Sequence, residues 1–425
     1  MGYSGRCLGE VLAAVLFAHA AAGCTGEPTG GQVLRMEGSA PTHQDPPDEQ
    51  AREDPVPPDA APEESDSDPG HSMQVLACAD ILPGEPGSGR SIILRANAPE
   101  ANCGPGTGDG AGSLALTNSG PLGATGWNIV SREGLDTGNR FFGGDLAIDI
   151  LSQPRGFHVI RIPPGGATLT AYSSVGEFLR SVTLTERGGV PFDVVVDPRG
   201  GTLVAQWDPR EGGTQVLTFQ FFDATGLSRT APIDVVSAPQ SESRAVAAGV
   251  DTQGRALLLW QESGTGAWVG QWRNRNGAAI TEPFTFPAPA STFGGLLSPL
   301  AGGGLALRNG DQWVAGFPSG RPLAQPAPGW LVSHPGTSLA LIRGQRANAL
   351  LPPPTLVEGS GCQETLLFFA TDGTACGELA LPFGGGSCFQ RKLGIAPDGT
   401  VIQQLDLNIP SNNQCAWRWW PRLLR

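Results

Sequence analysis

The chain has 425 residues and a formal net charge of −13, from 27 basic and 40 acidic residues. Proteins that bind nucleic acids present a basic surface to the phosphates, so this charge balance argues against a nucleic-acid partner. Lys392 is the only lysine, and it follows Gln390 and Arg391 rather than a glycine-rich loop. The chain therefore has no P-loop for nucleotide phosphates.

Residues 1–23 have the layout of an export signal, with Arg6 before an apolar run at 11–23 that is too short to span a bilayer. The run ends in Ala21-Ala22-Gly23-Cys24. This ending resembles the lipobox of bacterial lipoproteins, which implies that Cys24 is diacylated and becomes the new N-terminus. Ala in place of Leu at the first lipobox position departs from that pattern, and the alternative is a secretory signal cleaved near the same place. Both predict export, and the first predicts membrane attachment through lipid only.

Residues 24–72 form an acidic, proline-rich linker in this interpretation. Twelve acidic residues against Arg35 and Arg52 give the segment a net charge of −10, and it contains nine prolines. So few apolar residues cannot offset the entropy of ordering the chain, so the segment is predicted to be disordered. Residues 73–425 then form the folded domain.

The cysteines agree with export, because an even number in an exported domain predicts disulfides. With Cys7 in the signal and Cys24 lipidated, six remain: Cys78, Cys103, Cys362, Cys376, Cys388 and Cys415. We favour a Cys362–Cys376 pair, because a glycine turn between them would bring two strands together, although six cysteines allow 15 connectivities. A zinc site is the competing interpretation. The domain has no C-x-x-C pair and only two histidines, His158 and His334, so no metal or cofactor is predicted.

From about residue 140 the chain repeats a β-hairpin. Its copies pair an apolar strand with a glycine turn and a second strand, as in 147–162, 192–207 and 245–260, with weaker copies at 295–307, 330–342 and 392–405. A second hairpin type follows each copy except the last. Its turn glycines, spaced 50, 51, 43 and 53 residues apart, are Gly176, Gly226, Gly277, Gly320 and Gly373.

Two hairpins in each unit of about 45–50 residues are typical of a four-stranded propeller blade. Each such sheet is apolar on both faces and must lie between two neighbours, which a closed ring provides for every unit. The fold class is therefore all-β, a β-propeller, with a pair of β-sandwich domains as the alternative. Seven blades are favoured, with residues 73–135 supplying one blade and the last unit, 386–425, lacking a fourth strand. The alternative is six blades, with N-terminal strands completing the last one.

This pattern resembles β-propellers in general. Asp-x-x-Gly before Val/Leu-x-x-Trp recurs in several propeller families, and Ala396-Pro397-Asp398-Gly399-Thr400 is similar to the turn of the Tol-type periplasmic propeller repeat. The resemblance covers about 350 residues. It implies the fold and no activity.

One set of polar residues shares a register. Seven residues before Gly156, Gly200, Gly254 and Gly399 stand Asp149, Asp193, Ala247 and Lys392. Because innermost strands begin at the mouth of the channel, Asp149, Asp193 and Lys392 are the candidate ligand-binding residues, and a structural ion pair is the competing explanation. No catalytic motif stands in its proper context, and the two histidines are predicted to be packed or solvated rather than catalytic.

The tryptophans at 207 and 260 occupy matching strand ends and are predicted to pack between blades. Trp417, Trp419 and Trp420 alternate along a strand, so at least one is expected to be exposed for binding a sugar or a protein. The sequence thus favours a non-enzymatic binding or scaffold protein at the cell envelope, on the outer membrane or the cell surface. Its partner would be an envelope protein or glycan facing loops 208–215 and 237–244. The alternative is a propeller hydrolase or lyase acting on an extracellular polysaccharide through Asp149 and Asp193.

Overall fold

A computed structural model of the chain divides it into two units, Met1–Gly70 and His71–Arg425. The described residues all belong to the second unit: 75–95, 102–119, 125–134, 136–141, 146–162, 166–185, 192–240, 245–262, 265–286, 297–309, 312–318, 325–358, 361–383, 388, 393–405 and 414–425. The predicted signal, the lipidation site Cys24 and the predicted linker lie outside these residues.

The described elements are two single-turn helices and 30 strands. The helices are α1 (Cys78–Ile81) and α2 (Gly329–Val332). Numbered as blades in chain order, the strands are as follows: in blade 1, β2 (Asn102–Gly108), β3 (Leu114–Ser119), β4 (Thr125–Val130) and β5 (Asp136–Phe141); in blade 2, β6 (Leu146–Gln153), β7 (Gly156–Ile162), β8 (Ala167–Ser173) and β9 (Phe178–Thr185); in blade 3, β10 (Phe192–Val196), β11 (Thr202–Arg210), β12 (Thr214–Phe222) and β13 (Ile233–Pro239); in blade 4, β14 (Val246–Val250), β15 (Ala256–Gln261), β16 (Trp268–Arg273) and β17 (Phe284–Phe286); in blade 5, β18 (Leu297–Pro299), β19 (Leu305–Asn309), β20 (Gln312–Gly316) and β21 (Gln325–Pro326); in blade 6, β22 (Ser338–Ile342), β23 (Ala347–Leu351), β26 (Thr365–Ala370) and β27 (Ala375–Ala380), with the inserted hairpin β24 (Thr355–Val357) and β25 (Gly361–Gln363); and in blade 7, β28 (Leu393–Ile395), β29 (Val401–Leu405), β30 (Gln414–Trp420) and β1 (Arg90–Arg95).

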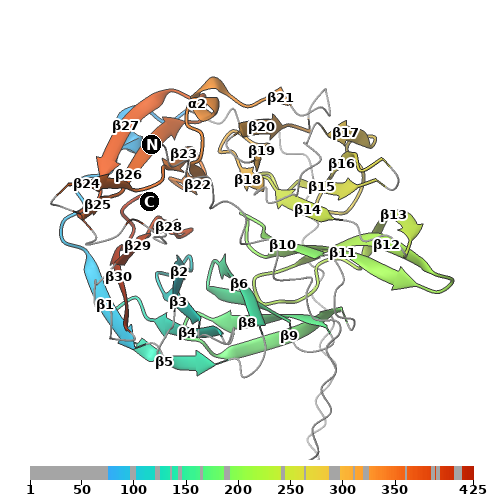
Figure 1. Ribbon diagram of the computed structural model, residues 1–425, viewed down its shortest axis with the longest axis horizontal. Coiled ribbons are helices and arrows are strands. Elements are labelled where there is room, and N and C mark those ends of the chain that lie inside the picture. The colour runs from blue at the N-terminus through green and yellow to red at the C-terminus, as the bar shows by residue number, and fades with distance from the viewer. Residues whose placement is uncertain are drawn as a thin grey trace, which may run out of the picture. The chain divides into compact units, whose positions relative to one another are not determined.

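The domain is a seven-bladed β-propeller, which confirms the predicted fold class and the favoured blade number. Seven four-stranded antiparallel sheets stand side by side around a ring, with the first strand of each sheet innermost (Figure 1). The alternative of two β-sandwich domains is wrong. The physical reason is visible in the apolar core, which is divided among the gaps between neighbouring blades.

Blade 3 shows how each sheet buries both faces. Along β11, Leu203, Ala205 and Trp207 pack with residues of blade 4. Val204, between them, packs with residues of blade 2. Because side chains alternate across a strand, a strand that is apolar at every position needs a neighbour on each side. Within the described residues there are seven buried apolar clusters, one for each gap between blades.

The N-terminal strand closes the ring. β1 pairs antiparallel with β30 in register from Arg90↔Trp419 to Arg95↔Gln414, so it is the outermost strand of blade 7. The sequence analysis placed residues 73–135 in a blade of their own and left the last unit one strand short. The last unit does supply only three strands, β28, β29 and β30, as predicted. The bounds 73–135 are wrong for a blade, because β1 pairs with β30 and blade 1 begins only at β2.

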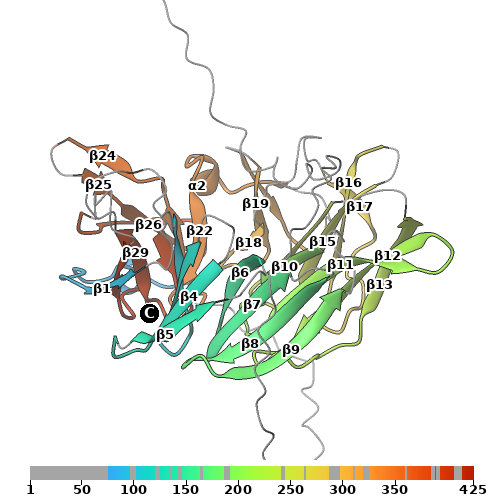
Figure 2. The same cartoon turned by 60° about the horizontal axis from the view of Figure 1, so that its bottom comes forward.

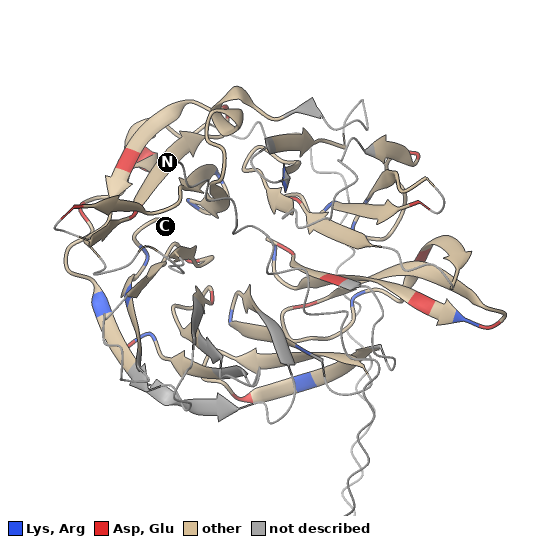
Figure 3. Ribbon diagram, in the orientation of Figure 1, with Lys and Arg blue, Asp and Glu red and all other residues tan. Residues whose placement is uncertain are grey.

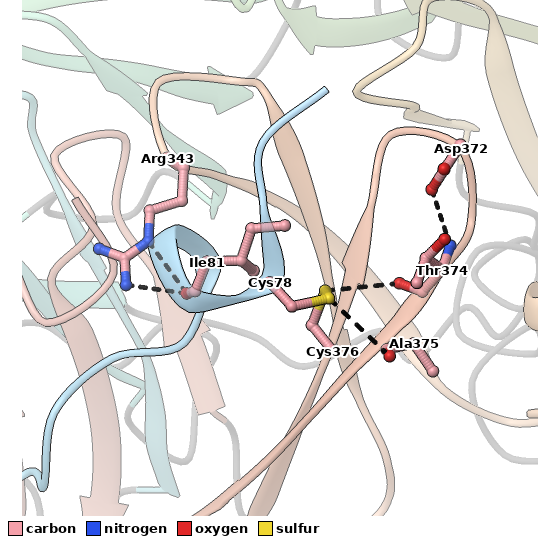
Figure 4. The surroundings of a disulfide bond; sticks show 7 residues. All are labelled: Cys78, Ile81, Arg343, Asp372, Thr374, Ala375 and Cys376. Atoms are coloured by element: carbon pink, nitrogen blue, oxygen red, sulfur yellow. Dashed lines mark hydrogen bonds between the residues drawn. A yellow bond between two sulfur atoms is a disulfide. The ribbon is translucent and has the colours of Figure 1, made fainter. Parts of the chain in front are cut away.

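The N-terminal helix lies against blade 6, where Ile81 of α1 is buried in the cluster between blades 6 and 7. A disulfide joins Cys78 to Cys376 of β27, across 298 residues of sequence (Figure 4). The Arg343 guanidinium donates to the Ile81 carbonyl at 2.8 and 3.0 Å, and it also donates to the carbonyl of Arg425. Both ends of the domain are thus fixed to one turn of blade 6.

The second disulfide joins Cys362 of β25 to Cys388. The predicted Cys362–Cys376 pair is therefore wrong, because Cys362 belongs to the inserted hairpin and not to the strand that faces β27. Cys415 in β30 is also disulfide-bonded. Its partner lies outside the described side chains, as does the side chain of Cys103. The disulfides indicate an oxidising, exported environment.

The turn glycines have the backbone conformation that their position requires. Gly176, Gly226, Gly277 and Gly373 have φ between +79° and +91°. A side chain at Gly277 would also meet the Ile233 side chain at 2.2 Å, because this turn of blade 4 packs on β13 of blade 3. The regular glycine spacing in the sequence therefore marks contacts between blades as well as turns. Gly320 lies outside the described residues.

The tryptophan predictions had mixed outcomes. Trp207 and Trp260 are buried in the cluster between blades 3 and 4, as predicted. The expectation of an exposed tryptophan at the C-terminus is wrong, because Trp417, Trp419 and Trp420 are 0, 2 and 3% exposed. Their strand, β30, is covered at its edge by β1 and on its two faces by blades 1 and 6.

Neither described helix is long and apolar enough to cross a membrane.

Candidate functional site

The ring has two faces with different chemistry. We call the loop face the side on which innermost strands begin, where the second and third strands of each blade are connected and where blades are joined. We call the turn face the opposite side, where the tight turns of both hairpins lie, as at residues 197–201 and 223–227 of blade 3. The antiparallel register Phe192↔Gln206 and Thr202↔Phe222 fixes this assignment.

A hairpin of β24 and β25 projects from blade 6 on the loop face (Figure 2). Leu356 is 71% exposed, and Val357 of the same strand is also exposed. Phe383, after the last strand of blade 6, is exposed as well. The Cys362–Cys388 disulfide ties the base of the hairpin to the connection that leads into blade 7. The exposed apolar side chains of Leu356 and Val357 therefore lie on a hairpin that a disulfide fixes in place.

The predicted partner-facing loops lie on the same face. Residues 208–215 form the end of the β11–β12 hairpin, where Arg210 pairs with Asp234 at 3.2 Å. Residues 237–240 are the end of β13 and its turn, while 241–244 lie outside the described residues. The side chains of Arg210 and Asp234 are 49 and 65% exposed, so this ion pair contributes little to stability.

Of the candidate ligand-binding residues, only Asp193 has a described side chain. Its Oδ2 accepts a hydrogen bond of 2.8 Å from the backbone N–H of Ala248, and its Oδ1 accepts one of 2.9 Å from Val194. Asp193 thus joins the innermost strands of blades 3 and 4. This contact agrees with the structural explanation of the register. Asp149 lies in β6 with its side chain outside the described part, and Lys392 lies outside it altogether, so the grouping of the three stays a prediction.

The two histidines of the domain differ in their surroundings: His158 is buried, and His334 is partly exposed. His158 is fully buried between blades 2 and 3, with Nδ1 2.7 Å from Thr202 Oγ1 and Nε2 3.2 Å from the carbonyl of Ala224. A carbonyl only accepts, so Nε2 carries the proton and Nδ1 accepts from the hydroxyl. Burial lowers the pKa of His158 to about 4. His334 approaches the carbonyl of Trp330 at 2.7 Å through Nδ1.

On the turn face, the first-hairpin turns come together over the channel. Gln345 of blade 6 donates to the carbonyl of Pro198 of blade 3, so these two turns are in contact although 147 residues separate them. Pro154 of blade 2 packs on the turns beside it, at Gly110 and Gly200. The first-hairpin turns of blades 3 and 6 are therefore in contact across the ring.

Charged residues are sparse and mixed in sign over the described ribbon (Figure 3). Several aspartates close the first-hairpin turns: Asp109, Asp197 and Asp251 are buried, and each accepts backbone N–H bonds within its own turn. Burial raises the pKa of Asp109, whose Oδ2 accepts from Ser174. No group of three or more His, Cys, Asp or Glu residues in the described part of the chain is arranged to hold a metal ion.

Sequence reasoning missed two features. The inserted hairpin of blade 6 has no repeat counterpart; its only signal was the extra length of the unit at 331–383 and the presence of Cys362. It also missed a group of arginines on the turn face at Arg199, Arg229 and Arg275. These come from two blades and three turns, so no local spacing relates them.

No protein-family model matches the chain, and no curated protein matches it either. Solved structures similar to it include the WD40 domain of SCAP from fission yeast, with 7% identity and a TM-score of 0.37 over 78% of this chain and 88% of that one. Another is a crystal structure of the eukaryotic initiation factor, with 11% identity and a TM-score of 0.38 over 76% of this chain and 91% of that one.

Prolyl oligopeptidase B from Galerina marginata is also similar, with 10% identity and a TM-score of 0.43 over 72% of this chain. The chain spans about half of that peptidase, 47% of its length. Similarity at this level of identity concerns the fold alone and assigns no activity.

Proposed function

We propose that the protein is a binding or scaffold module of the cell envelope, held there by lipid on Cys24, whose loop face binds an envelope protein. The observation that carries this proposal is the hairpin of β24 and β25. Leu356 and Val357 are exposed to solvent on this hairpin, which the Cys362–Cys388 disulfide fixes in place. Isolated exposed apolar residues are common, but apolar residues on a rigid projection are typical of anchors in protein interfaces.

The burial of His158 supports a binding role over a hydrolytic one. The nitrogens of His158 are both occupied within the core, so it has no route to a substrate. Asp193, one of the two carboxylates that the enzyme alternative requires, accepts hydrogen bonds from two backbone N–H groups. These hydrogen bonds give Asp193 a structural role between the innermost strands of blades 3 and 4.

The test compares the parent with a double variant that carries Leu356→Asp and Val357→Ser. The amount of envelope protein that each captures from intact cells is measured. Both positions are exposed, so the variant should keep the melting temperature of the parent and lose the captured partner. The control is Val175→Ser, at an exposed apolar position on the turn face of blade 2. Equal capture by all three proteins would show that the hairpin is not the binding surface.

A second experiment addresses the enzyme alternative. The parent is compared with a double variant that carries Asp149→Ala and Asp193→Ala. Both are incubated with envelope polysaccharides, and the released sugar is measured. Release by the parent that disappears in the double variant would overturn the binding role. The lipid anchor is tested separately: Cys24→Ala should lose acyl mass and leave the membrane fraction, and its retention there would refute the anchor.

A further inference from the structure

Three arginines gather on the turn face at the gap between blades 3 and 4. Arg199 lies in the first-hairpin turn of blade 3, Arg229 follows the second-hairpin turn of that blade, and Arg275 lies in the corresponding turn of blade 4. The Cδ atoms of Arg199 and Arg275 lie 3.3 and 3.8 Å from the position of a Cβ on Gly254. The guanidinium groups of Arg229 and Arg275 approach the same oxygen, Asp197 Oδ2, at 3.7 and 3.1 Å.

The buried carboxylate of Asp197 does not account for all three arginines. Its Oδ1 accepts a hydrogen bond of 2.9 Å from the backbone N–H of Arg199, and its Oδ2 accepts one of 3.1 Å from Arg275. Arg229, at 3.7 Å, is too far for a hydrogen bond. Asp197 is therefore satisfied without Arg229, and its single charge does not neutralise three guanidinium groups.

In the described part of the chain, two members of the cluster have guanidinium N–H groups without an acceptor: the buried Nε of Arg275 has none, and neither has Arg229. The Arg229 side chain is 33% exposed, and within the described residues its guanidinium makes no hydrogen bond. A guanidinium carries five N–H donors; those of Arg229 are open to a ligand from solvent, whereas the buried Nε of Arg275 is removed from water without an acceptor. Burial and the charge of Arg275 together lower the pKa of Arg229. The charges of Asp197 and Asp223 oppose this effect, so two carboxylates face the three guanidinium groups of the cluster.

We propose that Arg199, Arg229 and Arg275 form a binding site for a phosphate or sulfate group. A tetrahedral oxyanion offers several acceptor oxygens at once, and planar guanidinium groups match them with paired N–H donors. An anion here supplies the acceptors that Arg229 lacks and offsets the repulsion among the three cations. Arg199 keeps most of its donors available, since its only described side-chain bond runs from Nη1 to the carbonyl of Gln253 at 3.2 Å.

The experiment measures binding of inorganic phosphate and of sulfate to the full chain by calorimetry and by thermal shift, at constant ionic strength with chloride as the background anion. Saturable binding that raises the melting temperature is the expected result. Arg229→Gln should weaken binding about tenfold or more, the loss expected for one charge-assisted hydrogen bond. The matched control is Arg210→Gln, an arginine of the same blade on the loop face, which should bind as the parent does.

Two outcomes overturn the proposal: no saturable response to either anion, or equal affinity in the parent and the Arg229→Gln variant. If Arg229→Gln does not fold, Arg199→Gln replaces it, because the exposed Arg199 side chain has little structural role. The source of the group is distinguished by two further probes. Glucose 6-phosphate tests a soluble sugar phosphate, and sedimentation with phosphatidylcholine vesicles with and without phosphatidic acid tests a lipid headgroup.

Discussion

The buried His158 makes the propeller's stability depend on pH. His158 of β7 is fully buried against β11 of the next blade. Its neutral ring completes a polar network with Thr202 and Gln153. In this network Gln153 Nε2 donates to Thr202 Oγ1 at 3.1 Å. Protonation would put a second donor at Nδ1 against this hydroxyl and a charge in the core. Burial therefore lowers the pKa of His158 from 6.5 to about 4, against the smaller opposing effects of the Ala224 carbonyl and Asp223.

The direction of the effect follows from proton linkage. Because the pKa is lower in the folded state, the unfolded chain binds more protons between about pH 4 and pH 6.5. The stability that the neutral His158 ring contributes is therefore fully present above pH 6.5 and is lost as the pH falls toward 4. A difference of about 2.5 pKa units corresponds to about 3 kcal/mol of unfolding free energy.

The assay is urea unfolding of the parent and of His158→Gln, with disulfides intact, at several pH values from about 7 down to about 4. The variant cannot titrate at this position, so its loss of stability over that range should be about 3 kcal/mol smaller than that of the parent. Burial raises the pKa of Asp109. This group is present in both proteins, so its effect on stability cancels when the two are compared. Parallel stability curves for the two proteins would refute the reasoning.

Three further predictions concern closure of the ring and the predicted rim. Cys78→Ser with Cys376→Ser should lower the unfolding free energy by about 2–4 kcal/mol, because the disulfide constrains a long loop of the unfolded chain; urea unfolding measures this. Trp417→Ala should cost about 3–5 kcal/mol in the same assay, since the ring is fully buried between blades 7 and 1. Asp193→Ala should cost about 1–3 kcal/mol by leaving the N–H of Ala248 without an acceptor.

Each of these has its own control and contrary result. For the disulfide, hydrogen exchange should show residues 75–95 losing protection first in the double variant; uniform loss over all blades would contradict the closure role. For Trp417, the comparison is Leu356→Ala, whose stability should match the parent, and an equal cost at both positions would be inconsistent with the burial difference. For Asp193, the Asn variant keeps an acceptor oxygen and should lose less than the Ala variant. Equal losses would mean that the hydrogen bond to Ala248 contributes nothing.

The repeat pattern determined the architecture in advance because it is local. Glycines such as Gly176, Gly226 and Gly277 mark turns with positive φ, and the strands between them are apolar at successive positions. A strand that is apolar on both sides can only be satisfied between two others, so units of four strands predicted stacked blades. The blade number and the two-hairpin unit followed from counting these signals along the chain.

The candidate sites were less predictable, because they depend on residues far apart in sequence. Asp193 lies near the start of the innermost strand β10, and its partner is a backbone N–H of the next blade, which no side-chain pattern reports. The exposed hairpin at Leu356 and the arginine group around Asp197 were both missed. The first is an insertion that breaks the repeat, and the second joins three turns of two blades.

The sequence by itself thus determined the class of fold, the repeating unit and, through the cysteines, an oxidising environment. Only the tertiary structure decided where the ring closes, which cysteines pair and which tryptophans are buried. β1 completes blade 7, and it covers a strand whose Trp417 would otherwise lie near an open edge. The reason is physical: alternation and turn chemistry act over a few residues, whereas closure brings together segments about 300 residues apart, whose pairing is selected by the geometry of the whole ring.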